Sequence, residues 1–367
     1  MSADAIYVTQ TRLPDVETFY DRVREIIDSR WITNEGQCVR QLEQALSTYL
    51  GCQHLIVCNN GTTALMLALH CAGLRGKKIA VTAFSYVATL SALLWIGCTP
   101  IFIDIDPNTL SMSPEQLEQA FTEHPDIAGV LPVHIYGLPC DDTDLSDICR
   151  KHKAKLIYDA AHAFGSIWHG RSLLDFGDYS ICSFHATKLF HTVEGGCVIA
   201  HSEKAKDALS LSRAFGHRDD VHYTLGINAK MSELHAAMGL CLLPQTKTEI
   251  ALRKKLHAAY TAALDTLPVT RPVPAKDFEW NYAYYPILLP NEKVLLAILS
   301  TLASKNIYPR RYFYPALTTL PYVQQWRRPC PVAEDAATRS LCLPLYGKLS
   351  IKTALKIASV IHEYLAV

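Results

Sequence analysis

The stretch Leu156-Ile157-Tyr158-Asp159-Ala160-Ala161-His162 decides how the rest of the chain is interpreted. Its first three residues are typical of a buried strand, and an acid, two small residues and a histidine follow. Ligands of open α/β sheets bind beyond the carboxyl ends of the strands. Asp159 at that edge is therefore either the N-cap of a helix or a functional carboxylate, and the stretch alone leaves both readings open.

Similar β-rich runs lie on both sides of this stretch, and helical patterns separate most of them. Strands are predicted at His54–Cys58, Lys78–Thr82, Pro100–Asp104, Gly129–His134, Leu156–Asp159, Tyr179–Phe184 and Gly196–Ala200. Helices are predicted at Thr62–Cys71, Val87–Ile96, Pro114–Thr122 and Asp144–Lys151. Strands that are apolar on both faces and alternate with helices predict a mostly parallel sheet covered by helices.

The two ends of the chain have other patterns. Residues 16–30 and 39–50 are predicted to be amphipathic helices, and a helical pattern from Lys230 to Leu264 should be interrupted at Pro244. The tail contains a predicted strand and two helices, at Tyr282–Leu289, Glu292–Lys305 and Ile351–Leu365, around an aromatic stretch at Asn306–Pro331. We therefore expect a large α/β domain over residues 1–250 and a small C-terminal α+β domain over residues 251–367.

Composition excludes several classes of protein. The 367 residues carry 35 basic and 35 acidic side chains, and this zero balance argues against a general nucleic-acid binder. No apolar run approaches the roughly 18 residues of a membrane helix, and the first residues lack the pattern of a signal peptide. The 12 cysteines form no CxxC pair, so no metal site is expected and the thiols are interpreted as buried small side chains in a reducing cytosol.

Asn59-Asn60-Gly61-Thr62-Thr63 follows a predicted strand and opens a helix. Gly61 permits close backbone approach, and Thr62 offers a hydroxyl beside the free N–H groups of the helix start. Such a turn binds phosphate groups. The alternative is an ordinary N-cap, because Asn and Thr favour that position.

A third polar cluster surrounds Lys188, between Ser183, His185 and the turn Thr192–Gly196. A lysine at a strand end is usually solvated. A partly neutral lysine near a carboxylate and a phosphate site instead forms Schiff bases and carries protons. Pyridoxal 5′-phosphate requires these three parts, namely a phosphate cradle, a carboxylate for its ring nitrogen and a lysine. The sequence therefore predicts that cofactor.

Several stretches in one order resemble the DegT/DnrJ/EryC1/StrS family of nucleotide-sugar aminotransferases, from about Trp31 to the C-terminus. They are WITNEGQCVRQLEQAL (31–46), NNGTTALMLAL (59–69), TAFSYVATLSALLWIGCTPIFIDID (82–106), LIYDAAHAFGS (156–166), SFHATKLFHTVEGG (183–196) and GINAKMSELHAAMGL (226–240). The resemblance implies a fold-type I pyridoxal-phosphate enzyme, similar to aspartate aminotransferase. Because Lys188 is present where dehydratase members have His, it implies amino transfer.

The resemblance also implies roles for individual residues. Lys188 matches the catalytic Schiff-base lysine, and Asn228 matches a residue that the partner subunit supplies to the phosphate, so a homodimer with composite active sites is implied. The other cofactor contacts implied are Asp159 at the ring nitrogen, Gly61, Thr62 and Ser183 at the phosphate, Tyr86 on the ring face and His162 beside the ring.

SFHATKLFHTVEGG and NIYPRRYFYP (306–315) resemble the subgroup that acts on dTDP-linked keto-6-deoxyhexoses. The implied reaction moves nitrogen from L-glutamate to C4 of dTDP-4-keto-6-deoxyglucose, in the cytoplasm, for bacterial O-antigen lipopolysaccharide. The substrate contacts expected are His185, Arg310, Arg311, Tyr312 and Tyr314, although a surface loop with core tyrosines is the alternative.

Two other functions stay open at this stage. The motifs do not separate C4 from C3 amination of a dTDP-3-keto-6-deoxyhexose, gluco from galacto products, or dTDP from UDP. A non-catalytic ligand-binding or regulatory protein on the same fold would have lost the lysine, the acid or the phosphate turn, and all three are intact.

Overall fold

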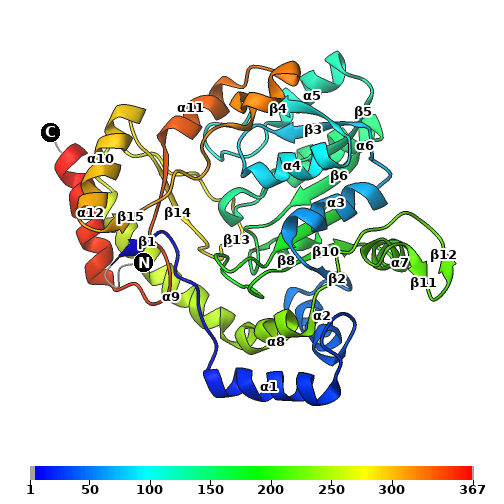
Figure 1. Cartoon of the computed structure of the whole chain (residues 1–367). Coiled ribbons are helices and arrows are strands. Elements are labelled where there is room, and N and C mark those ends of the chain that lie inside the picture. The colour runs from blue at the N-terminus through cyan, green and yellow to red at the C-terminus, as the bar shows by residue number, and fades with distance from the viewer. Residues whose placement is uncertain (1–4, 366–367) are drawn as a thin grey trace.

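A seven-stranded sheet forms the centre of the computed structural model, which describes residues 5–365 (Figure 1). Its strand order is β2-β10-β9-β6-β5-β3-β4. The strands are β2 (His54–Cys58), β3 (Lys78–Thr82), β4 (Thr99–Ile103), β5 (Ile127–Leu131), β6 (Lys155–Asp159), β9 (Tyr179–Ser183) and β10 (Gly196–Ala200). Only β10 runs antiparallel to its neighbours in this sheet, so the mostly parallel sheet expected from the sequence is confirmed.

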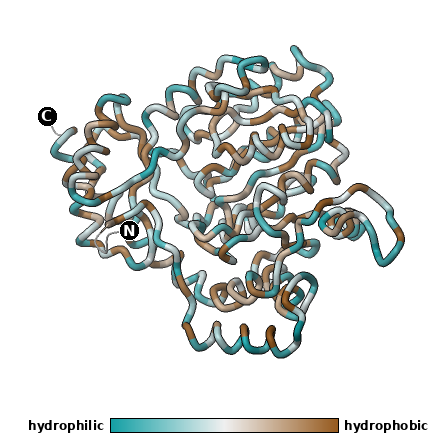
Figure 2. The backbone as a smooth tube through the Cα atoms, viewed as in Figure 1, coloured by the Kyte–Doolittle hydropathy of each residue, from teal (hydrophilic) through white to brown (hydrophobic). Residues whose placement is uncertain are grey.

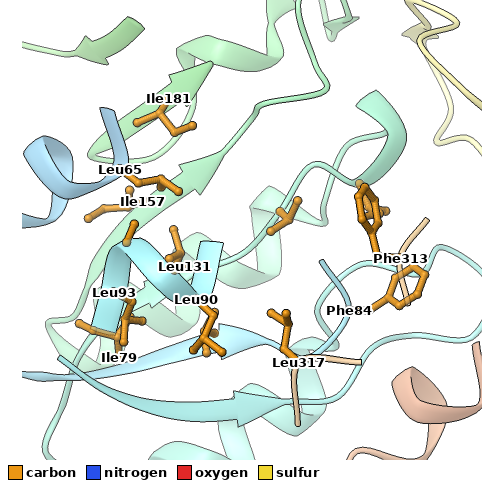
Figure 3. Close-up of a cluster of buried hydrophobic side chains, with 14 of the residues drawn as sticks. Leu65, Ile79, Phe84, Leu90, Leu93, Leu131, Ile157, Ile181, Phe313 and Leu317 are labelled. Atoms are coloured by element: carbon orange, nitrogen blue, oxygen red, sulfur yellow. The ribbon is translucent and has the colours of Figure 1, made fainter. Parts of the chain in front are cut away.

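Helices cover both faces of this sheet. The helices of the sheet region are α1 (Val16–Ser29), α2 (Gln37–Leu50), α3 (Gly61–Cys71), α4 (Val87–Trp95), α5 (Pro114–Glu123), α6 (Asp142–His152), α7 (Glu203–Arg213) and α8 (Glu233–Leu242). One apolar cluster packs α3, α4 and α7 on one face, and a second packs α2, α5, α6 and α8 on the other. Figure 3 shows part of the first cluster, where Leu65 of α3 meets Ile157 of β6 and Ile181 of β9.

The expected break in the long helical pattern is confirmed at Pro244. Helix α8 ends at Leu242, a 3₁₀ turn covers Leu243–Gln245, and α9 (Thr246–Leu264) continues the chain. The expected helix Ile351–Leu365 is α12, and the expected helix Glu292–Lys305 is α10 (Glu292–Ser304). The sequence interpretation missed α7, α11 (Pro331–Arg339) and β16 (Ser340–Leu343).

The C-terminal third of the chain builds a separate apolar cluster beside the sheet. Helices α9, α10 and α12 pack around the antiparallel pair of β14 (Tyr285–Leu288) and β16, and Figure 1 shows these helices gathered on one side. The N-terminal strand β1 (Ile6–Tyr7) pairs there with β15 (Ile307–Tyr308). The division of the chain at residue 250 stays a prediction.

Two small sheets lie outside the central sheet and the C-terminal cluster. Strand β7 (Ile167–Trp168) lies between β8 (Arg171–Ser172) and β13 (Phe278–Glu279), whereas β11 (His217–Arg218) and β12 (Val221–His222) form a hairpin that projects beside α7 in Figure 1. Figure 2 shows mainly hydrophobic colour along the buried central strands and hydrophilic colour on many outer turns. None of the helices described between residues 5 and 365 has the length and apolar character needed to cross a membrane.

After β15 the chain returns to the carboxyl edge of the sheet. The Leu317 N–H donates to the carbonyl of Ala83 at 2.9 Å. The buried Asp104 carboxylate accepts the N–H groups of Val332 and Ala333 at the start of α11, at 3.0 and 2.9 Å. A carboxylate at a helix N-terminus is favourable because it satisfies free amides and opposes the helix dipole. These contacts hold residues 310–313 over the end of the sheet.

Candidate active site

A cavity of about 290 Å³ opens at the carboxyl ends of β3, β6 and β9. The N-terminus of α3 forms one wall, and Tyr284, just before β14, and Phe313, in the segment that returns after β15, form another. The predicted site residues that line it are Gly61, Thr62, Tyr86, Asp159, His162, Ser183, His185, Lys188, Arg310 and Tyr312. Ten side chains or backbones from distant parts of the sequence thus meet in one place, as expected for an open α/β sheet.

Asp159 ends β6 and is buried beneath the cavity. Its Oδ2 accepts the Thr89 hydroxyl at 2.7 Å, and its Oδ1 accepts the Ala161 N–H at 3.1 Å. Burial raises the pKa of Asp159, while both hydrogen bonds and the Lys188 charge act in the opposite direction. Because Asp159 caps no helix in this structure, the functional-carboxylate reading of the sequence is the one the geometry favours.

Lys188 lies in a loop that follows β9. The Phe184 N–H donates to the Gly195 carbonyl at 2.8 Å and the Thr192 N–H donates to the Phe184 carbonyl at 2.9 Å, so the loop is closed on itself. Loss of hydration lowers the pKa of Lys188, and the Asp159 carboxylate opposes that change. A lysine with a lowered pKa has more of the neutral amine that acts as nucleophile and base.

The start of α3, which we call the anion cradle, has the geometry of the predicted phosphate site. The Asn60 side chain accepts the Thr63 N–H at 2.8 Å and so caps the helix, which leaves the Gly61 and Thr62 amides without an intrahelical acceptor. A Cβ at Gly61 would lie 2.9 Å from Ser183 Cβ. Glycine is therefore required for the helix to approach β9 this closely. The N-cap reading of this turn is confirmed for Asn60, and the geometry also leaves room for the anion-site reading, which stays a prediction.

Aromatic groups flank the space between these parts. His162 is buried, stacks on Phe313 at 5.3 Å with an interplanar angle of 4°, and accepts the Tyr136 N–H at Nδ1 at 3.3 Å. Burial, with a contribution from Lys188, lowers the pKa of His162 well below its usual value. Tyr86 is 55 % exposed at the start of α4, where its ring is free to meet a flat ligand.

Three predicted site residues do not line the cavity. The Arg311 guanidinium donates to Glu292 at 2.6 Å and to the Thr338 carbonyl at 3.1 Å, and it lies over the Tyr314 ring. This pairing turns both Arg311 and Tyr314 away, so the expectation that they reach a ligand in this cavity is not met. Asn228 is exposed and accepts a hydrogen bond from Lys230 at 2.7 Å.

The sequence analysis did not select four residues that complete the cavity. Thr89 binds Asp159, Tyr284 contacts Lys188, and Glu194 approaches His185 with 3.6 Å between the carboxylate and Nε2. Phe313 supplies the surface on which His162 stacks. Thr89 lies one turn after Tyr86 in a predicted helix, and this spacing could have identified Thr89 as a site residue. Tyr284 and Phe313 come from the C-terminal part of the chain and carry no local signal for this site.

Comparison with known proteins gives a consistent result over nearly the whole chain. The sequence model of the DegT/DnrJ/EryC1/StrS aminotransferase family matches residues 15–362. A dTDP-4-amino-4,6-dideoxy-D-glucose transaminase of Shigella dysenteriae is 37 % identical over 364 residues, which cover 98 % of each chain. The Escherichia coli transaminase of the same name is 34 % identical over 370 residues, covering 98 % of this chain and 99 % of the relative.

A solved structure agrees with the sequence matches. The crystal structure of DesI in the presence of its TDP-sugar product superimposes with a TM-score of 0.92 at 31 % identity. The superposition covers 98 % of this chain and 93 % of DesI. The fold expected from the sequence, that of fold-type I enzymes, is therefore confirmed.

Proposed function

The chain belongs to the DegT/DnrJ/EryC1/StrS aminotransferase family and is a nucleotide-sugar aminotransferase, and we propose that its sugar substrate is dTDP-4-keto-6-deoxyglucose. L-Glutamate would supply the amino group, and the product would be dTDP-4-amino-4,6-dideoxyglucose. The names of the two transaminase relatives support this sugar, and the DesI structure supports a TDP-linked substrate. The observation that carries the chemistry is the meeting of Lys188 and Asp159 in one cavity beside the anion cradle.

The residues present fit pyridoxal 5′-phosphate on the structure's own evidence. The Gly61 and Thr62 amides without an intrahelical acceptor and the Ser183 side chain would hold its phosphate, and the lack of a Cβ at Gly61 lets the start of α3 lie close to Ser183. Asp159 offers a buried carboxylate for the ring nitrogen, and Lys188 offers an amine. When bound, the cofactor supplies an electron sink for the negative charge that develops as an amine loses its α-proton.

In this proposal the chain's own residues orient the reactants and move the proton. Asp159 would pair with a protonated ring nitrogen, and Tyr86 and His162 would lie against the ring. Lys188 Nζ would take the proton that the amino donor loses and carry it within the cavity, and it would deliver a proton in the opposite direction when the keto sugar is the reactant. A positioned general base and acid of this kind accelerates proton transfer by about 10²–10⁴-fold.

The mouth of the cavity supplies the groups for the nucleotide sugar. Arg310 is exposed there and lies 5.5 Å from the Tyr312 ring centroid, while His185 is tied to the Thr187 hydroxyl at 2.8 Å. We assign the diphosphate to Arg310 because guanidinium groups match phosphate geometry. His185 and Tyr312 would contact the sugar. Arg311 and Tyr314 are left out of this assignment because Arg311 pairs with Glu292 and lies over the Tyr314 ring.

A homodimer with shared active sites is part of the proposal. Asn228 lies outside the cavity of its own chain, next to the anion cradle, where Asn59 Nδ2 donates to its carbonyl at 3.5 Å. Several apolar side chains near it in the sequence are half or more exposed, namely Phe215, Val221, Tyr223 and Leu225. Exposed apolar groups of this kind mark protein interfaces. A cytosolic location and supply of a bacterial surface sugar stay predictions from the resemblance.

Two measurements test the function. The purified protein is mixed with pyridoxal 5′-phosphate, and its visible absorbance is recorded before and after L-glutamate. We expect a yellow band that bleaches. A colourless protein would contradict the cofactor assignment, and a band that ignores glutamate would contradict the amino donor.

The sugar is tested separately with dTDP-4-keto-6-deoxyglucose and with a dTDP-3-keto-6-deoxyhexose. NMR of the products locates the new nitrogen and its stereochemistry. We expect an amino group at C4 in the gluco configuration. Nitrogen at C3 would overturn the proposed substrate while leaving the aminotransferase activity in place.

A further inference from the structure

Tyr284 joins the C-terminal part of the chain to Lys188. In the part of the chain that the structure describes, its hydroxyl is the one hydrogen-bond partner of Lys188 Nζ, at 3.4 Å. We propose that Tyr284 is a positioning residue that holds the Lys188 amine in the cavity whenever that amine is not engaged with a ligand. This inference rests on the proposed function, because it concerns how the same lysine is kept ready for proton transfer.

The ring of Tyr284 is held firmly enough to aim its hydroxyl. The residue is buried, and its ring meets His162 edge-on at 5.0 Å and Tyr312 edge-on at 5.8 Å. Tyr136 packs against it at 5.9 Å. Aromatic contacts of this kind fix ring orientation at little cost in entropy. The hydroxyl therefore has a defined place beside Nζ, whereas the lysine stem is intrinsically flexible.

Buried polar contacts set the backbone just before Tyr284. The Asn281 side chain is fully buried, and its Nδ2 donates to the carbonyls of His162 and Phe164 at 2.7 and 3.0 Å. Its Oδ1 accepts the Ala283 N–H at 3.0 Å. Asn281 thus ties the chain that carries Tyr284 to the loop that follows Asp159. A buried hydrogen-bond network in which every member has a partner specifies one geometry. The positions of Tyr284, Lys188 and Asp159 relative to one another are therefore fixed.

The Tyr284 hydroxyl positions Lys188 Nζ and does not itself act as an acid or base. Burial raises the pKa of Tyr284, so the hydroxyl stays protonated at working pH. Its oxygen accepts a hydrogen bond from the ammonium form of Lys188, which favours that form over the neutral amine. The other ionisable groups that face Lys188 are Asp159, Cys182, Tyr312, Tyr86 and His162. None of these changes in a Tyr284→Phe protein, so a shift in the lysine's titration reports the lost hydroxyl.

Tyr284→Phe tests the inference, because it removes one oxygen and keeps the ring packing. Cofactor-free protein is mixed with pyridoxal 5′-phosphate at a series of pH values, and the rate at which visible absorbance appears is plotted against pH. The neutral amine is the reacting form, so the midpoint reports the Lys188 pKa. We expect the midpoint to fall by roughly 1–2 pH units, since a hydrogen bond to a charged group contributes about that much.

Tyr285→Phe is the matched control. Its hydroxyl contacts Thr261 at 3.2 Å and Arg271 at 3.3 Å, outside the cavity. That variant should keep the wild-type midpoint. In turnover, Tyr284→Phe should lower kcat about tenfold and leave KM for glutamate within about twofold, because the lost contact is to the lysine and not to the substrate.

The outcomes separate this inference from the proposed function. If wild-type protein never develops the absorbance band, the function itself is wrong. If wild type develops it and Tyr284→Phe shows the same midpoint, the positioning role is wrong and the function stands. A midpoint does not depend on signal amplitude, so a partly folded variant still gives a decisive answer.

Discussion

At the scale of single residues, Lys188 has two chemical roles in the proposed reaction. Replacement by Ala removes both the nucleophile and the proton carrier, so we expect kcat to fall at least about 10³-fold. The assay is formation of the amino sugar from glutamate and the keto sugar, followed by chromatography. Circular dichroism should be unchanged, because the lysine is not part of an apolar cluster.

Lys155→Ala is the control for that experiment. Lys155 begins β6, and its half-exposed side chain pairs with Asp178 at 2.7 Å, at the end of the strand opposite Asp159. Loss of this surface pair should change stability by about 1 kcal/mol or less and leave turnover intact. Near-normal turnover of Lys188→Ala would refute the assigned mechanism.

Residue type and position after a strand were sufficient to select Lys188, Asp159 and the Gly61 turn, and the structure brings all three to one cavity. They were not sufficient to separate Arg310 from Arg311. The two are neighbours of the same charge, yet one lines the cavity and the other is turned away by Glu292. That difference depends on a partner 19 positions away, which no local pattern records.

At the scale of elements, the close packing of α3 against β9 shapes the proposed phosphate site. A Cβ at Gly61 would lie 2.9 Å from Ser183 Cβ and 3.3 Å from its Cα. Gly61→Ala must therefore push the helix start away from the strand and disturb the free amides. We expect affinity for pyridoxal 5′-phosphate to fall at least about tenfold, which is roughly 1.4 kcal/mol. Titration of the visible band measures it.

Gly51→Ala is the matched glycine control. Gly51 caps α2 in a left-handed conformation at φ 69° and no atom would lie within 4 Å of its added Cβ. The change should cost about 1 kcal/mol of folding stability and leave cofactor affinity alone. Equal affinities for wild type and Gly61→Ala would show that the cradle lies elsewhere.

Most elements of the sheet were predictable because apolar runs and helical periods alternate cleanly. The strand His54–Cys58 and the helix Ile351–Leu365 agree residue for residue. The antiparallel direction of β10 was not predictable, since strand direction follows from connections and not from composition. Helix α11 was missed because its stability comes partly from Asp104, a cap supplied from far away in the sequence.

At the scale of the whole molecule, buried neutral histidines link folding to pH. His134 is fully buried, stacks on Tyr158 at 4.3 Å, and accepts the Cys140 N–H at Nδ1 at 3.1 Å. Burial lowers the pKa of His134 to about 3. Between about pH 6.5 and 3, His134 is therefore protonated in the unfolded chain and neutral in the folded chain. Because the unfolded chain binds the extra proton, the free energy of unfolding falls as the pH drops through this range.

His134→Asn removes this titration and keeps an acceptor for the Cys140 N–H. Between pH 6.5 and 4.5 the unfolding free energy of wild type should fall more steeply than that of the variant, by about 1.4 kcal/mol per pH unit. Urea unfolding followed by fluorescence measures both slopes. Above pH 7 the two slopes should coincide, and equal slopes below pH 6.5 would contradict the assignment.

The proposed shared active site would be a property of the dimer and not of a single chain. Lys188 belongs to the cavity of its own chain, whereas Asn228 is exposed outside that cavity and is proposed to serve the partner's phosphate. Lys188→Ala removes the first group. Asn228→Asp places a negative charge against the second site and should repel the phosphate. Each variant alone should be nearly inactive.

Mixing the two variants in equal amounts, with exchange of subunits, distinguishes a site built by two subunits from a site built by one. A hybrid dimer has one site with both defects and one site with neither. Random pairing makes about half of the dimers hybrid, so about a quarter of the wild-type activity should return. If Asn228 instead served its own chain, every hybrid site would keep one defect and no activity would return. Mixing each variant with itself provides the baseline, and sedimentation confirms that both variants form dimers before the comparison is made.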